Sequence, residues 1–294
     1  MEGFNHQFKK VSQRINDELY FNGYTKLGNI GATNLKKVIL ETENLKEEIK
    51  PYCKSGKLFA LIDTHLSLFL QSNKIAQDYL ADYVKYFFSE EEVDVFGASH
   101  LVKPFGNKSK FACHQDSSIV NEPDNFSINA WMPLTDVNRL NGCIWMLPGS
   151  HILPNFRRIA GQGPFVLEDI QKDLWKKMIP IPVKAGDVIL FHRSILHGSS
   201  RNFLPWHRYR FAIEAIVLPK NAQLIVNYVD ENTPQNKVHT INIKKEHFFE
   251  NEDPRGEILK GLDDSILNDY PAKEFLREQL YEYFEKFKQR ANSI

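Results

Sequence analysis

The chain has 294 residues, of which 42% are hydrophobic and 25% charged, values typical of a globular protein with a substantial core. Lys and Arg together number 37, as do Asp and Glu, so no net charge draws the chain to nucleic acid or an anionic membrane. The three cysteines are far apart and lack CxxC spacing, which argues against a disulfide framework. With a polar N-terminus and no apolar run approaching about 18 residues, the expected location is the cytoplasm.

Residues 1–91 are predicted to form an N-terminal helical segment. Apolar residues recur at three- and four-residue steps from Phe4 to Leu19, which predicts an amphipathic helix ending before Asn22-Gly23. A second helix is predicted over residues 34–49. A third is expected to follow Ser72-Asn73.

From residue 92 to 219 the pattern changes to short β-branched and aromatic runs broken by Gly, Pro and Asn, which predicts an antiparallel sandwich or barrel. Residues 155–178 interrupt these runs, and we interpret them as a lid with a helix from Leu167. Residues 220–294 are predicted to add a strand and an amphipathic C-terminal helix. Because no repeat or Pro-rich linker separates these parts, the whole chain, 1–294, is expected to form one domain.

Two short motifs within this β-rich region have the composition of a metal site. Side chains alternate along a strand, so His114 and Asp116 are expected to point to the same side, with Gln115 turned away. Together with His197, they could occupy one face of an octahedral Fe(II) and leave three positions for a bidentate 2-oxo acid and O2. Cys113 faces away from His114, which favours iron over a structural zinc. Taken alone, however, each histidine is more often a structural residue than a ligand.

An arginine beyond the second histidine could hold the far carboxylate of a 2-oxo acid through its planar fork of donors. Arg208 lies 11 positions after His197 (208 − 197) and is the predicted clamp. Arg210 lies two residues further, on the same strand face, so the sequence leaves somewhat open which guanidinium meets the carboxylate.

The order of these motifs resembles the phytanoyl-CoA dioxygenase family of Fe(II)/2-oxoglutarate oxygenases over roughly residues 99–216. The resemblance is carried by the following motifs: His114-Gln115-Asp116, Ala130-Trp131, Asn141-Gly142-Cys143, Pro148-Gly149-Ser150-His151, Ala185-Gly186-Asp187, His197-Gly198-Ser199, Asn202 and Arg208. It implies a mainly β fold with flanking helices, the double-stranded β-helix or cupin-like jelly roll.

The same resemblance implies a site and a reaction. Iron would be held by His114, Asp116 and His197. The co-substrate 2-oxoglutarate would be held by Arg208 and Ser199, with Trp131 and Lys103 lining its pocket and the segment from Ser99 to Lys103 bordering it. With O2, such an enzyme forms succinate and CO2 while oxidising its substrate. Because a carboxylate stands at Asp116, hydroxylation is favoured over the halogenation catalysed by relatives with a small residue there.

Two polar side chains share a strand face with Trp131 and are expected to enter the barrel. We assign Asn129 to the co-substrate and Ser127 to the substrate, although a structural water would satisfy both side chains equally well.

The predicted reaction is hydroxylation of an aliphatic C–H in a small metabolite: a free amino acid, an acyl-thioester or a natural-product intermediate. Desaturation or ring closure would use the same site. Arg157 and Arg210 favour an anionic or zwitterionic substrate, but solvated loop charges would give the same pattern. The alternative function is a non-catalytic jelly-roll module that holds Zn or Ni. Arg208 argues against it, because such a module needs no carboxylate clamp.

Overall fold

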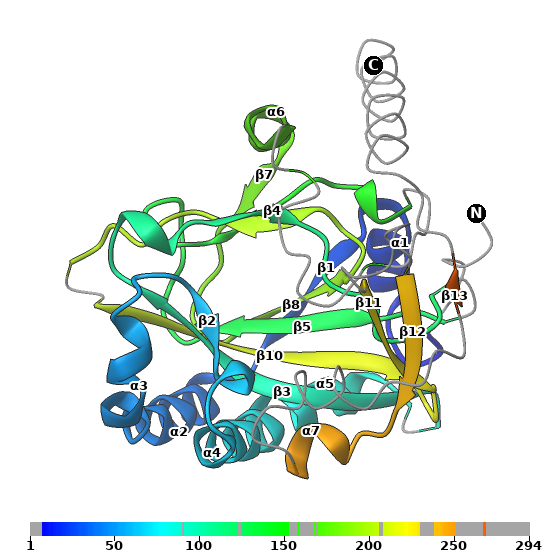
Figure 1. Cartoon of the computed structure of the whole chain (residues 1–294), viewed down its shortest axis with the longest axis horizontal. Helices are drawn as coiled ribbons and strands as arrows, with labels where there is room; N and C mark the ends of the chain where they lie inside the picture. Colours follow the sequence, from blue (N-terminus) through cyan, green and yellow to red (C-terminus); the bar gives the residue numbers. More distant parts are fainter. Residues whose placement is uncertain are drawn as a thin grey trace.

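The fold was examined in a computed structural model that describes residues 8–89, 91–122, 125–152, 158, 167, 170–205, 208–229, 238–250 and 267–268. In it, two antiparallel sheets face each other, and helices cover the outside of the larger one (Figure 1). The larger sheet has the order β1-β8-β5-β10-β3-β2, and the smaller has the order β4-β9-β6-β7. From β3 to β10 the chain passes repeatedly from one sheet to the other, which is the double-stranded β-helix expected from the sequence.

The strands of the larger sheet are β1 (Tyr24–Asn29), β2 (Phe59–Ala60), β3 (Val93–Pro104), β5 (Ile128–Pro133), β8 (Asp187–His192) and β10 (Tyr209–Pro219). Those of the smaller sheet are β4 (Phe111–His114), β6 (Ile144–Met146), β7 (Ile179–Ile181) and β9 (His197–Ser199). A third sheet joins β11 (Leu224–Val229), β12 (Val238–Ile243) and β13 (Leu267–Asn268).

The α-helices are α1 (Gln13–Asn22), α2 (Ala32–Glu43), α3 (Lys46–Cys53), α4 (Leu66–Ala76), α5 (Asp82–Phe87), α6 (Gln171–Lys177) and α7 (His247–Glu250). A π-helical turn, η2 (Gln77–Ala81), joins α4 to α5, and 3-10 turns occupy η1 (Leu61–Asp63), η3 (Asn107–Ser109) and η4 (Ser150–Ile152). Among the described residues, no helix is both long and apolar enough to cross a bilayer.

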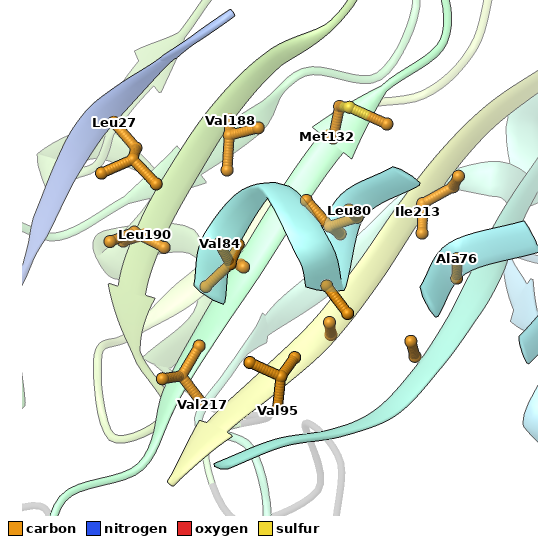
Figure 2. Packing of buried hydrophobic residues seen from close by; sticks show 14 of the residues in the cluster. Leu27, Ala76, Leu80, Val84, Val95, Met132, Val188, Leu190, Ile213 and Val217 are labelled. Carbon is orange, nitrogen blue, oxygen red and sulfur yellow. The ribbon is translucent and has the colours of Figure 1, made fainter. Parts of the chain in front are cut away.

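The main core lies between the larger sheet and the helices. Figure 2 shows Leu80 and Val84 of the α4–α5 region packed over Ile213 and Val217 of β10, with Val188 and Leu190 of β8 completing the layer. Because side chains alternate along β10, its even-numbered residues point to the opposite side, into the space between the two sheets. Arg210 and Glu214 are on that inner side.

The N-terminal segment was predicted to be helical, but it also contains two strands. Residues 24–29 form β1, which pairs with β8 at the edge of the larger sheet, and residues 59–60 form β2 on β3. The predicted helix over 34–49 is two helices, α2 and α3, and the one expected after Ser72 begins earlier, at Leu66. Helix α1 ends at Asn22, one residue later than predicted, because Gly23 follows it in the left-handed conformation with φ 79°.

Parts of two further predictions fall outside the described residues: most of 155–169 in the lid, and the helix over 271–291. The helix predicted from Leu167 is observed as α6. Its first residue, Gln171, donates to the carbonyl of Cys113 at 2.6 Å and accepts from the amide of Cys113 at 2.9 Å, which ties this part of the segment to β4.

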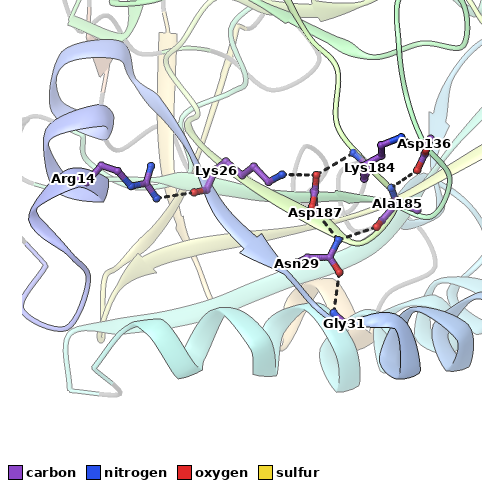
Figure 3. Close-up of polar contacts among 8 residues, drawn as sticks. All are labelled: Arg14, Lys26, Asn29, Gly31, Asp136, Lys184, Ala185 and Asp187. Carbon is purple, nitrogen blue, oxygen red and sulfur yellow. Dashed lines mark hydrogen bonds and ion pairs between the residues drawn. The ribbon is translucent and has the colours of Figure 1, made fainter.

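A polar cluster fastens β1 to β8 (Figure 3). The carboxylate of Asp187 accepts from Lys26 at 2.6 Å, from the side chain of Asn29 at 2.9 Å and from the backbone amide of Lys184 at 3.0 Å. Burial alone would raise the pKa of Asp187, but these hydrogen bonds outweigh it and the pKa is lowered. Asp187 therefore stabilises the sheet edge in its ionised form.

We expect Asp187→Asn to lower the free energy of unfolding by about 1–3 kcal/mol at pH 7, because it removes a buried charge-assisted acceptor. The stabilisation by a carboxylate of lowered pKa is present above about pH 4 and lost as pH falls through the folded-state pKa, so wild type and variant should converge in acid. Urea unfolding at pH 7 and near pH 3 measures both effects. Asp173→Asn, which breaks an exposed pair with Lys176, is the control and should change stability by less than about 0.5 kcal/mol. A pH-independent difference for Asp187→Asn would contradict this account.

Candidate active site

The three predicted ligands lie together between the two sheets. His114 and His197 are directly opposite each other on β4 and β9, and Asp116 follows the end of β4. The Oδ1 atom of Asp116 lies 3.5 Å from Nε2 of His114 and 3.9 Å from Nε2 of His197. One donor atom from each residue lies within 4.8 Å of the other two, which matches the donor set of a 2-His-1-carboxylate metal site.

The backbone of β9 lies unusually close to that of β4 at Gly198. A Cβ atom at Gly198 would lie 2.9 Å from the carbonyl oxygen of Phe111 and 3.1 Å from the ring of Trp175. Only glycine permits this spacing, so Gly198 sets the distance at which its neighbour His197 faces His114.

Hydrogen bonds to the backbone fix the tautomers of both histidines. Nδ1 of His114 lies 2.9 Å from the carbonyl of Ala112, and Nδ1 of His197 lies 3.0 Å from that of Ile195. A carbonyl only accepts, so Nδ1 carries the proton and Nε2 presents its lone pair toward Asp116. Burial, together with the proximity of His114, lowers the pKa of His197 to about 4, which keeps its imidazole neutral and able to bind a metal.

The second carboxylate oxygen of Asp116 is hydrogen-bonded to a neighbouring side chain. Its Oδ2 accepts a hydrogen bond of 2.6 Å from Nδ2 of Asn129, whose own Oδ1 accepts one of 2.6 Å from Arg193. Arg193 thereby fixes the orientation of the amide so that its NH2 group faces the carboxylate. With Oδ2 engaged in this way, Oδ1 is the oxygen left to bind a metal.

Charge also favours the ionised form of Asp116. Burial alone would raise the pKa of this carboxyl, but Arg193, His197 and His114 outweigh it and hold the pKa well below its ordinary value. Asn129 therefore contacts a ligand residue, whereas the sequence assigned it to the co-substrate. Arg193 was not identified from the sequence, because no motif or spacing linked it to Asp116.

The two arginines on the strand have opposite surroundings. Arg208 precedes β10, is exposed, and lies with its guanidinium 5.6 Å from the ring centre of Tyr209. Arg210, which the sequence assigned to the substrate, is 1% exposed and lies 5.5 Å from the ring centre of Trp131 in the interior. Arg208 is therefore exposed where a buried clamp was predicted, whereas Arg210 is buried in the interior.

Lys103 lies directly opposite Arg210 on β3 and is also fully buried. Its ammonium donates to the carbonyls of Ser109 and Ser200. Burial, and then the charge of Arg210, hold the pKa of Lys103 well below its ordinary value. Gly142 makes room for it, since a Cβ there would lie 2.4 Å from Cδ of Lys103.

These two cations form the half of the interior that fits 2-oxoglutarate. Within the described part of the chain neither makes an ion pair, and Nε and Nη1 of Arg210 are buried without a hydrogen-bond partner. Adjacent buried cations are costly unless an anion joins them, and a terminal carboxylate matches the two vacant donors of the guanidinium. Ser199 lies two residues beyond His197, so its side chain lies on the same face of β9, and it is buried.

The other predicted site residues are engaged elsewhere. The hydroxyl of Ser99 accepts from the amide of Ile62 at 3.1 Å, so it links β3 to η1 instead of bordering the co-substrate. The hydroxyl of Ser127 donates to Glu122 at 2.6 Å, and Glu122 forms a buried ion pair of 2.6 Å with Arg158. These contacts contradict the assignment of Ser127 to the substrate. Arg157 lies outside the described residues.

A family model described as phytanoyl-CoA dioxygenase matches residues 39–203, more than half of the chain. Phytanoyl-CoA dioxygenase 1 of Oryza sativa subsp. japonica is 27% identical over 124 residues, 42% of this chain and 44% of that protein. Phytanoyl-CoA dioxygenase domain-containing protein 1 of Danio rerio is 31% identical over 115 residues, 37% of this chain and 40% of its own length. The chain thus matches less than half the length of these relatives.

Solved structures share the fold at lower identity. The α-ketoglutarate-dependent carbocyclase SnoK from nogalamycin biosynthesis superposes with a TM-score of 0.54 at 17% identity, covering 74% of this chain and 87% of that one. HygX of Streptomyces hygroscopicus, crystallised with nickel and 2-oxoglutarate, gives a TM-score of 0.51 at 15% identity, covering 72% and 88%. The jelly roll, with its clustered His, Asp and His side chains, is thus accompanied by a sequence match over most of the domain, and the chain belongs to the phytanoyl-CoA dioxygenase family.

Proposed function

We propose that the protein is an Fe(II)- and 2-oxoglutarate-dependent dioxygenase that hydroxylates an aliphatic C–H of a small metabolite. One observation carries the proposal: the three-donor cluster of His114, Asp116 and His197 lies in the same interior as a buried arginine with two unpaired donors. A binding module for a metal alone would have no use for that arginine.

In this proposal the metal is held by Nε2 of each histidine and by Oδ1 of Asp116. Because Asn129 engages Oδ2, Asp116 would contribute a single oxygen, and the three residues would leave room on the metal for 2-oxoglutarate and O2. Bound iron supplies activation of O2 coupled to decarboxylation of 2-oxoglutarate, which gives succinate and CO2. The protein's residues orient the co-substrate and exclude water from the ligands, whose side chains are 6%, 18% and 10% exposed for His114, Asp116 and His197.

Arg210 is proposed to hold the far carboxylate of 2-oxoglutarate. Lys103 adds a second positive charge, Trp131 provides a flat wall beside the guanidinium, and Ser199 offers a hydroxyl from the opposite sheet. With Arg210 in this role, that residue no longer favours an anionic substrate, and Arg157 lies outside the described residues.

Loss of a histidine ligand tests the metal site. His197→Ala and His114→Ala should each weaken Co(II) binding by at least about 100-fold and abolish 2-oxoglutarate turnover, because two donors hold the ion too loosely. Isothermal titration with Co(II) measures the affinity. His65→Ala, which removes an exposed cap of α4, is the control and should bind Co(II) like wild type. Unchanged Co(II) affinity in His197→Ala would refute the assignment.

The two arginines form a matched pair of variants for co-substrate binding. Arg210→Lys should raise the Kd for 2-oxoglutarate by about ten-fold or more, because one ammonium cannot reproduce the guanidinium fork. Arg208→Lys should leave it within about two-fold, since that side chain is exposed. Anaerobic titration of Fe(II)-loaded protein, followed by the visible absorption of the complex, gives both values. The opposite order would restore Arg208 as the clamp.

Asn129→Ala tests the support behind Asp116. Without the amide, Asp116 is free to rotate and to present both oxygens, so we expect Co(II) affinity to fall by about 10- to 100-fold. Titration with Co(II) measures the change, and urea unfolding of the metal-free variant controls for loss of fold. If both affinity and stability stay at the wild-type level, Asn129 does not position the ligand.

A further inference from the structure

Glu214 is an acidic side chain on the inner face of β10 that the site described above does not use. It lies directly opposite Trp131 on β5 and Ser99 on β3, and alternation puts it on the same face as Arg210, four residues earlier. That spacing corresponds to roughly 13 Å along the strand. Its nearest neighbours on this face of β10, Ala212 and Ile216, are apolar, so the carboxyl group stands between two apolar side chains.

Glu214 makes no hydrogen bond or ion pair to any residue that the structure describes, although it is half-buried. The nearby hydroxyl and guanidinium groups contact other residues, although Nε of Arg193 is buried without a hydrogen-bond partner. Ser99 accepts from Ile62, and the two terminal nitrogens of Arg193 donate to Asn129 and to the carbonyl of Ser117. A carboxyl group with a structural role is normally hydrogen-bonded, and half-buried Glu214 has no such contact among the described residues.

The surroundings of Glu214 disfavour its ionised form, which a positively charged partner would stabilise. Burial, and then the charge of Asp116, raise the pKa of Glu214 to about 8, while Arg193 acts in the opposite direction. A ligand that brought both a positive charge and N–H donors would stabilise the ionised carboxylate. A ligand carboxylate would instead be repelled by Glu214 and Asp116 together.

The inner face of β10 therefore has a basic side chain at one end and an acidic side chain at the other. Arg210, paired with Lys103 on β3, makes one end positive and suited to a dianionic co-substrate. Asp116, which is held ionised, and Glu214, whose ionised form a cation would stabilise, make the other end suited to a positive group. Two ligands that enter the same interior would be sorted by the sign of their charge.

We propose that Glu214 binds the primary substrate, and that this substrate carries a protonated amine which pairs with the Glu214 carboxylate. The inference rests on the proposed function, because it assumes that the metal and 2-oxoglutarate occupy the positions assigned above. The ammonium group would anchor the substrate on β10, beside the metal ligand Asp116, and so place a neighbouring C–H toward the metal.

The test uses three isosteric probes of different charge: n-butylammonium, n-butanol and n-butyrate. Each is titrated anaerobically into the Fe(II)- and 2-oxoglutarate-loaded protein, and the change in the visible absorption band reports binding near the metal. The proteins are wild type, Glu214→Gln, which keeps the shape but removes the charge, and Glu47→Gln as a control at an exposed glutamate on α3.

Wild type and Glu47→Gln should bind n-butylammonium at least about ten-fold more tightly than n-butanol, and n-butyrate should not bind. Glu214→Gln should lose the preference for n-butylammonium over n-butanol while its Kd for 2-oxoglutarate stays within about two-fold of wild type. Equal binding of the ammonium by wild type and Glu214→Gln, tighter binding of n-butyrate or n-butanol, or no binding of n-butylammonium would each overturn the inference.

The same experiment separates this inference from the proposed function. The absorption band forms before any probe is added, so its absence would refute the proposed function itself and the inference with it. A normal band with no charge preference among the probes would refute the role of Glu214 alone.

Discussion

The alternation of side chains along β10 is the constraint on which both the fold and the site depend. Ile213 and Val217 face the helices and are buried in the main core, whereas Arg210 and Glu214 face the space between the sheets. A shift of one residue in the register of this strand would place charged groups under α4 and α5 and apolar groups in the site. The hydrophobic burial that holds β10 under the helices therefore also fixes which side chains can reach a ligand.

The site contains charges that a core selected only for stability would not retain. Lys103 and Arg210 lie side by side without an anion among the described residues, and Glu214 has no partner there. Each such group costs free energy when desolvated and uncompensated. Where the structure uses buried charge for stability, it pairs the groups, as in Glu122 with Arg158. The unpaired groups are thus distinguished from structural ones by the absence of compensation, not by burial alone.

The sequence was most informative where chemistry and strand geometry coincide. The His-x-Asp spacing predicted that His114 and Asp116 lie on one side of a strand, and the structure brings their donor atoms together with that of His197. The family resemblance placed the β-rich region in a jelly roll, which the strand order confirms. Predictions that relied on residue spacing across a loop were less reliable. The connection between His197 and β10 is irregular, so counting 11 residues could not establish whether Arg208 or Arg210 enters the interior.

Other features depend on contacts that the sequence pattern does not encode. Residues 24–29 form an edge strand because a polar cluster with Asp187 ties them to β8, although Gly28 weakens their local β pattern. The role of Asn129 depends on which way its amide faces, and this is set by Arg193, a residue 64 positions away in the chain. Ser127 and Asn129 share a strand face, yet one binds Glu122 and the other Asp116. Periodicity can assign a residue to a face but not to a partner.

In the proposed function, bound ligands would compensate the unpaired charges of the interior. A metal ion compensates Asp116, which is already held ionised by Arg193 and the two histidines. A dianion between Lys103 and Arg210 would offset the burial and the repulsion that lower the pKa of Lys103, and it would fill the donors that Arg210 leaves unpaired. Because each ligand binds the folded chain and has no such site in the unfolded one, binding raises the free energy of unfolding. In the proposed function, the same uncompensated groups that cost stability would give the jelly roll its affinity for charged ligands.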